Sequence, residues 1–236
     1  MKIGILKTDT VLPQWVDEYG EYPDMFIELL GTRDPSLSFV TYDVMEQQYP
    51  ADLDEVDAYL VTGSRHSVYE EVEWITTLHS FIRQLHAAGK KMVGICFGHQ
   101  LIALALGGQA RKADAGWGQG LHKHTFTEKP DWFGDGSEEL AVLVSHQDQV
   151  IEPAPGARTI AGSDFCPNAV CQMGDQILTF QGHPEFKPNY SREIMNYRRE
   201  LIGEEVYARG MASLEQSPET ERMAAWIIAF LKKNAV

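Results

Sequence analysis

Residues Val93–Ala103 read VGICFGHQLIA and carry the strongest local signal in the chain. The apolar run Met92–Ile95 predicts a buried strand, and the run Leu101–Leu106 predicts a helix. Cys96 falls at the corner between them within a G-x-C-x-G pattern, which is typical of a nucleophile elbow because so tight a corner leaves no room for flanking side chains. At the N-terminus of a helix, unpaired N–H groups stabilise a thiolate. The alternative is a small buried cysteine of no chemical role.

Composition and charge exclude several classes of protein. The 236 residues are 44% hydrophobic, with no internal repeat and no long linker, which predicts a single domain over residues 1–236. A net charge of −14 argues against a nucleic-acid partner. The short apolar run at Lys2–Lys7 is too little for a signal peptide or a membrane span, so we expect a cytoplasmic protein without a membrane partner. Cys96, Cys166 and Cys171 form an odd set without paired spacing, which favours a reducing compartment over a disulfide framework.

The first half alternates strands with helices. Strands are expected at Lys2–Lys7, Ser38–Val44 and Ala58–Thr62, with helices from Pro23 to Gly31 and over Trp74–Leu85. This alternation predicts an open, mostly parallel central sheet flanked by helices, with functional groups at the carboxyl ends of its strands.

The second half is rich in strands and should extend that sheet in antiparallel fashion. Two helices are expected to follow the strands, over Pro188–Ile202 and over Pro218–Lys233, the second with Ser217 as its N-cap. The strand candidates are Gln119–Thr127, Leu140–Ser145, Thr159–Ala161, Ala169–Met173 and Gln176–Phe180.

A nucleophilic cysteine needs a base, and the base needs a group that orients it. His183 and Glu185 follow a strand candidate and are separated by Pro184, which keeps the segment extended, so their side chains should leave on the same side. Other histidines, such as His122 and His124, lack a third ligand at a known spacing, so no metal site is expected.

Three motifs together resemble the class I glutamine amidotransferase domain and stand in that family's order. They are GICFGHQ at residues 94–100, SHQDQV at residues 145–150 and FQGHPE at residues 180–185. The pattern is most similar to stand-alone domains that resemble the glutaminase part of GMP synthetase. The resemblance implies a flavodoxin-like fold and a Cys96, His183 and Glu185 triad that hydrolyses the side-chain amide of glutamine through a γ-glutamyl thioester and releases ammonia.

The backbone N–H of Phe97, directly after the nucleophile, is the natural first oxyanion donor. The resemblance implies a second donor at Gly63 or Ser64. It also places Gln100, Ser145 and His146 at the substrate. Gln100 could instead lie on the helix surface or cap the helix, and His146 could be a buried structural histidine.

Two departures from the family pattern affect these expectations. The glycine loop often continues with proline in the family, but here Arg65 and His66 follow, and either could contact substrate or remain solvated. The chain also ends after its last predicted helix, so an ammonia acceptor would be a separate synthetase subunit.

Three functions remain open at this point. The first is hydrolysis of glutamine, and the second is a γ-glutamyl hydrolase or peptidase, which uses the same thioester chemistry with a more open pocket. The third is a non-catalytic protein whose Cys96 is a redox sensor. Neither enzyme needs a metal or organic cofactor. The aromatic pair Trp132 and Phe133 is either an interface or an anchor in the core or a loop.

Overall fold

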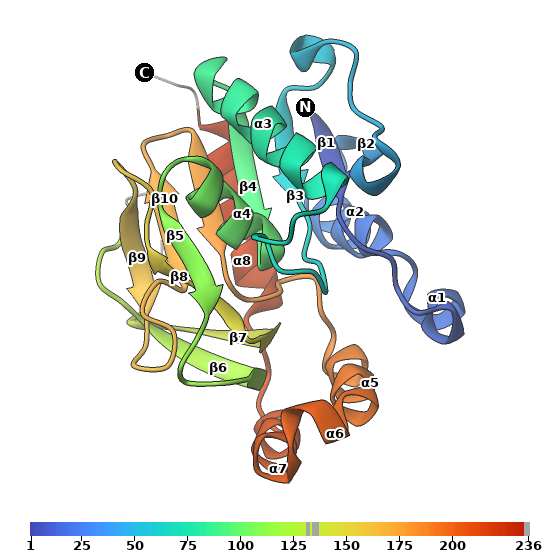
Figure 1. Cartoon of the computed structure of the whole chain (residues 1–236), viewed down its shortest axis with the longest axis vertical. Coiled ribbons are helices and arrows are strands. Elements are labelled where there is room, and N and C mark those ends of the chain that lie inside the picture. Colours follow the sequence, from blue (N-terminus) through green and yellow to red (C-terminus); the bar gives the residue numbers. More distant parts are fainter. Residues whose placement is uncertain (131–132, 134–136, 234–236) are drawn as a thin grey trace.

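The computed structural model describes residues 1–130, 133 and 137–233, and its centre is a twisted sheet (Figure 1). Within those residues the sheet has nine strands in the order β2-β1-β3-β4-β11-β10-β9-β6-β7, and β5 pairs with β8 in a separate ribbon. The strands are β1 (Lys2–Lys7), β2 (Ser38–Asp43), β3 (Ala58–Val61), β4 (Lys91–Ile95), β5 (Gln109–Lys112), β6 (Gly118–Phe126), β7 (Glu139–His146), β8 (Asp148–Glu152), β9 (Arg158–Gly162), β10 (Val170–Met173) and β11 (Ile177–Phe180).

The direction of the strands divides the sheet into two parts. Strands β2, β1, β3, β4 and β11 run parallel, whereas β10, β9, β6 and β7 join them through antiparallel pairs. The predicted α/β fold, with an antiparallel extension from the C-terminal half, is confirmed. The carboxyl ends of β1, β3, β4 and β11 therefore meet at one edge, where an open parallel sheet places its ligand site.

Helices cover both faces of the parallel part (Figure 1). On β1, Ile3 and Ile5 face the cluster that includes residues of α2 and α8, while Leu6 faces the cluster that includes residues of α3 and α4. None of the described helices is long and apolar enough to cross a membrane. The helices are α1 (Pro13–Tyr19), α2 (Tyr22–Arg33), α3 (Glu73–Ala87), α4 (Phe97–Ala105), α5 (Pro188–Tyr197), α6 (Arg199–Ile202), α7 (Glu204–Ser213) and α8 (Thr220–Lys232).

The elbow between β4 and α4 forms because its two glycines allow close approach. A methyl group on Gly98 would lie 2.5 Å from the carbonyl oxygen of Val61 in β3, and one on Gly94 would lie 2.7 Å from the carbonyl oxygen of Gly98. Between them, Cys96 has φ 49° and ψ −98°, a conformation that residues with side chains rarely adopt. The backbone at Cys96 is therefore strained, and this conformation places the cysteine side chain at the corner between β4 and α4.

Several predicted boundaries were wrong. Helix α4 begins at Phe97, four residues before the predicted start. The sequence did not indicate this first turn because it contains a glycine and two polar residues, although all of them are buried. Helix α2 continues past Gly31 to Arg33, because Gly31 does not adopt the positive φ with which a glycine ends a helix. The N-cap of α8 is Glu219 and not Ser217. β2 stops at Asp43, and the segment predicted as one helix to Ile202 is divided into α5 and α6.

Two of the α-helices and two of the β-strands in the described residues were not predicted. Helix α1 has no fully buried residue, and α7 buries only a glycine, so neither shows an apolar stripe in its sequence. Strands β5 and β8 form the separate ribbon and are short and largely polar.

Of the aromatic pair predicted as an interface or an anchor, Trp132 lies outside the described residues. Phe133 is described, and it is buried with its ring stacked on Trp226 at a centroid distance of 4.1 Å. Phe133 is therefore anchored to α8.

We predict that Gly98→Ala destabilises the protein by about 1–3 kcal/mol, because the added methyl group overpacks against the backbone of β3. Gly31→Ala is the matched control, since its methyl group would lie 3.6 Å from Phe39 within a helix. That change should stabilise the protein by about 0.5–1 kcal/mol. Urea unfolding measures both, and equal effects of the two changes would contradict this explanation of the elbow.

Candidate active site

Cys96 lies at the carboxyl end of β4 with 5% of its surface exposed. Its N–H donates to the carbonyl oxygen of Phe180 in β11 at 2.8 Å, and its own carbonyl oxygen accepts from the N–H of Gln100 in α4 at 3.1 Å. These two bonds attach the elbow to both neighbouring elements. The side chain is consequently fixed at the N-terminus of α4, where helix N–H groups have no intrahelical partner.

The loop after β11 brings His183 to the cysteine. Its N–H donates to the carbonyl oxygen of Leu143 in β7 at 2.8 Å. The imidazole Nδ1 lies 2.8 Å from Glu185 Oε1, and the Phe186 ring stacks on it at 3.9 Å. A methyl group on Gly63 would lie 2.8 Å from His183 Cε1, so the glycine makes room for the ring.

The charges around His183 favour its protonated form. Burial alone lowers the pKa of the imidazole, but the negative charges of Glu185 and Cys96, with hydrogen bonds to both, outweigh burial and raise the pKa to about 10. The structure thus brings the three predicted residues together, with a carboxylate on one side of the imidazole and a sulfur as its other partner.

The predicted oxyanion donors lie near Cys96 in the chain or in space. Phe97 is the first residue of α4, so its N–H has no acceptor within the helix. Gly63 and Ser64 follow β3, and a methyl group on Gly63 would lie 3.6 Å from Cys96 Cβ. Arg65 is bound to Asp9, and the His66 Nδ1 lies 2.8 Å from Glu70 Oε2.

A cavity of about 440 Å³ opens beside Cys96. One part of its wall is polar and includes Ser64, Gln100, Ser145, His146 and Arg198. Another part is aromatic and includes Trp15, Tyr22, Trp117, Tyr190 and Tyr197. The cavity beside the thiol therefore offers both polar groups and aromatic surface.

Gln100 was predicted to bind substrate, and it is buried, which excludes the alternative that it lies on the helix surface. Its Nε2 donates to the carbonyl oxygen of Asp148 at 2.8 Å and to Gln181 Oε1 at 3.1 Å. The Gln181 Nε2 in turn donates to Cys96 Sγ at 3.5 Å. Sequence reasoning missed Gln181, although it is a fully buried amide within the motif that contains His183.

Ser145 and His146 both line the cavity. Ser145 Oγ accepts from Arg198 Nη1 at 3.0 Å and from Gln119 Nε2 at 3.1 Å. His146 is buried, which lowers its pKa to about 3, and its Nδ1 is 3.1 Å from the carbonyl oxygen of Asp148. Its Nε2 has no partner in the part of the chain that the structure describes.

Arg198 is a second residue that sequence reasoning missed, since nothing in its local pattern marks it. It follows α5, lines the cavity and lies 5.8 Å from the Trp117 ring. It forms no ion pair with a carboxylate of residues 1–130, 133 or 137–233, whereas Arg65 is paired with Asp9. An unpaired guanidinium in a cavity is suited to bind a carboxylate.

Comparison with known proteins identifies the family. The model of the family "Glutamine amidotransferase class-I" matches residues 15–198. The chain belongs to the class I glutamine amidotransferase family. The resemblance drawn from the three motifs is therefore confirmed, and members of the family are hydrolases or amidotransferases.

Individual class I amidotransferase relatives differ in their activities. The chain is 32% identical to γ-glutamyl peptidase 2 of Arabidopsis thaliana over 222 residues, which are 91% of this chain and 89% of that protein. It is also 34% identical to a glutamine-hydrolysing GMP synthase subunit of Saccharolobus solfataricus over 137 residues, 58% of this chain and 71% of that protein. The crystal structure of a glutamine amidotransferase from Thermotoga maritima shares the fold, with a TM-score of 0.72, 17% identity and 98% coverage of both chains.

We predict that the protonation of His183 makes stability dependent on pH. Its folded pKa of about 10 exceeds the ordinary value of 6.5, so the stabilising contribution is complete below about pH 6.5 and is lost as the pH rises through 10. The difference in unfolding free energy between the wild type and His183→Gln should therefore shrink over this range. Urea titrations at several pH values measure it, and a constant difference would contradict the prediction.

Proposed function

We propose that this protein is a cysteine-dependent γ-glutamyl amide hydrolase whose catalytic residues are Cys96, His183 and Glu185. We further propose that its substrates carry a leaving group larger than ammonia, as in γ-glutamyl peptides. The cavity beside Cys96 supports this choice. At about 440 Å³ it lies in the range that holds ligands much larger than one amino acid, and it is open to solvent.

The reaction proceeds in two steps. The Cys96 thiolate attacks the γ-carbonyl carbon, and the protonated His183 gives its proton to the leaving nitrogen as the C–N bond breaks. The γ-glutamyl thioester remains. His183 then takes a proton from water, the hydroxide attacks the thioester, and glutamate leaves as the thiolate re-forms.

Glu185 keeps the imidazole in the orientation that this sequence of transfers requires. Its Oε1 accepts from Nδ1, which leaves Nε2 for the sulfur and the leaving group. The developing oxyanion is stabilised by the N–H of Phe97 and by a second donor at Gly63 or Ser64.

A second candidate is hydrolysis of glutamine with delivery of ammonia to a separate synthetase subunit. The similarity to the GMP synthase subunit of Saccharolobus solfataricus supports it. The polar wall around Gln100 and Ser145 would serve either substrate, because both present the same γ-glutamyl group. The two functions differ only in what the remainder of the cavity accepts.

Steady-state assays separate the two candidates. We expect faster release of amine from a γ-glutamyl anilide than release of ammonia from glutamine. Cys96→Ser should lower either rate at least about 1,000-fold, whereas Cys171→Ser, a change at a buried thiol outside the cavity lining, should retain activity. Preference for glutamine would favour the second candidate, and no Cys96-dependent turnover of either compound would refute both.

We also predict that Arg198 binds the α-carboxylate of the γ-glutamyl group. Replacing it by glutamine removes a charged hydrogen bond, so KM should rise about 10- to 100-fold with a smaller change in kcat. Arg199→Gln is a matched control, because the Arg199 side chain pairs with Glu204 at the surface. An unchanged KM in Arg198→Gln would exclude this role.

A further inference from the structure

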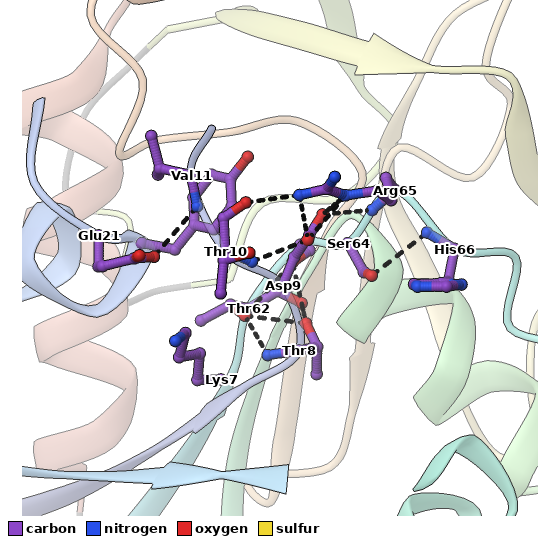
Figure 2. Close-up of polar contacts among 12 residues, drawn as sticks. Lys7, Thr8, Asp9, Thr10, Val11, Glu21, Thr62, Ser64, Arg65 and His66 are labelled. Atoms are coloured by element: carbon purple, nitrogen blue, oxygen red, sulfur yellow. Dashed lines mark hydrogen bonds and ion pairs between the residues drawn. The ribbon is translucent and has the colours of Figure 1, made fainter. Parts of the chain in front are cut away.

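The loop that carries the predicted oxyanion donors is attached to the segment that follows β1. Thr8 Oγ1 lies 2.9 Å from Thr62 Oγ1 and donates to the carbonyl oxygen of Gly63 at 2.9 Å (Figure 2). The Thr8 N–H also donates to Thr62 Oγ1 at 3.1 Å. Both threonines are buried, so these bonds continue the contact between β1 and β3 beyond the ends of the strands.

Asp9 is the strongest connection between the two segments. Only 5% of its surface is exposed, and its carboxylate accepts the backbone N–H of Arg65 at 2.8 Å and the Arg65 Nε at 2.8 Å. The Arg65 Nη2 lies 2.7 Å from the same carboxylate and donates to the carbonyl oxygen of Thr10 (Figure 2). The N–H of Thr10 donates to Asp9 at 2.8 Å. One buried carboxylate thus holds both the backbone and the side chain of the loop.

A further hydrogen bond holds the segment that contains Asp9 against α2. The N–H of Val11 donates to Glu21 Oε2 at 3.1 Å, and Glu21 is the N-cap residue of α2 (Figure 2). The segment that presents Asp9 is therefore attached to a helix that packs on the sheet.

We propose that Asp9 is a positioning residue that fixes Gly63 and Ser64 in the geometry needed to stabilise the oxyanion. This inference rests on the proposed function. Asp9 acts through the backbone N–H of Arg65, the residue directly after Ser64. The ion pair with Asp9 also holds the Arg65 guanidinium in place. Arg65 also lines the cavity, but its guanidinium is paired with Asp9, so we assign it to loop positioning.

The position of this loop matters because Gly63 packs against two catalytic groups. An added methyl group there would lie 2.8 Å from His183 Cε1 and 3.6 Å from Cys96 Cβ. Preorganised donors stabilise a transition state only at the correct distance, and a displacement of about 1 Å can cost about 100-fold in rate. A loop released from Asp9 would lose that fixed distance while the thiol and imidazole remain.

The test compares Asp9→Asn with Arg65→Ala in the full chain, using a γ-glutamyl anilide. Asp9→Asn places an amide group against the N–H donors and should lower kcat about 10- to 100-fold with KM within about twofold. Arg65→Ala keeps its backbone N–H bond to Asp9 and should lower kcat less. Asp43→Asn breaks an ion pair with Lys7 on the same side of the sheet and should change kcat less than about twofold.

Alkylation of Cys96 by iodoacetamide provides a readout that does not use the oxyanion donors. Its rate should stay near the wild-type value in Asp9→Asn, because the thiol and His183 are unchanged. Equal losses in alkylation and in kcat would indicate general disruption of the site and overturn the inference. A raised KM with an unchanged kcat in Arg65→Ala would do the same, because it would assign Arg65 to substrate binding.

The two proposals fail in different ways. A wild-type protein that hydrolyses the anilide, together with an Asp9→Asn variant of equal kcat, overturns the role of Asp9 alone. A wild-type protein without Cys96-dependent turnover of any γ-glutamyl amide overturns the proposed function and this inference with it.

Discussion

The close approach of α4 to β3 and β4 is the constraint on which the site depends. It requires glycine at positions 94 and 98 and forces Cys96 into a left-handed conformation. The side chain of Cys96 lines the cavity, and the backbone N–H of Cys96 donates to the carbonyl oxygen of Phe180, which holds the elbow against β11. Because β11 is the parallel neighbour of β4, the loop that carries His183 leaves the sheet beside the thiol.

Neighbouring charges also distinguish His183 from the other buried histidines. The only strongly raised histidine pKa among the described residues belongs to His183, where the carboxylate of Glu185 and the sulfur of Cys96 outweigh the effect of burial. The other buried histidines, such as His99 and His146, have lowered pKa values because burial is not offset by a neighbouring negative charge. The imidazole of His183 thus favours its protonated form, whereas those of His99 and His146 favour the neutral form.

The features that could be predicted from the sequence are those that depend on residues close together in the chain. The G-x-C-x-G pattern predicts a corner that sterics alone require, and the spacing of His183 and Glu185 around Pro184 predicts a shared direction for two side chains. Strand β1 was predicted to the residue because a short apolar run with polar ends has few alternatives. The sequence did not predict a place in the site for Asp9, Gln181 or Arg198. Each of them contacts the site through a residue more than 50 positions away in the chain, and no local pattern indicates such a contact.

The insertion of β11 next to β4 also has a consequence for biosynthesis. The thiol belongs to the first half of the chain, but the imidazole and carboxylate that we propose to activate it come from the loop after β11, near residue 185. A ribosome-bound chain that has emerged only through α4 contains the cysteine without its partners. Under the proposed function, the nucleophile is therefore activated only when the central sheet is complete, and an incomplete chain carries an ordinary thiol.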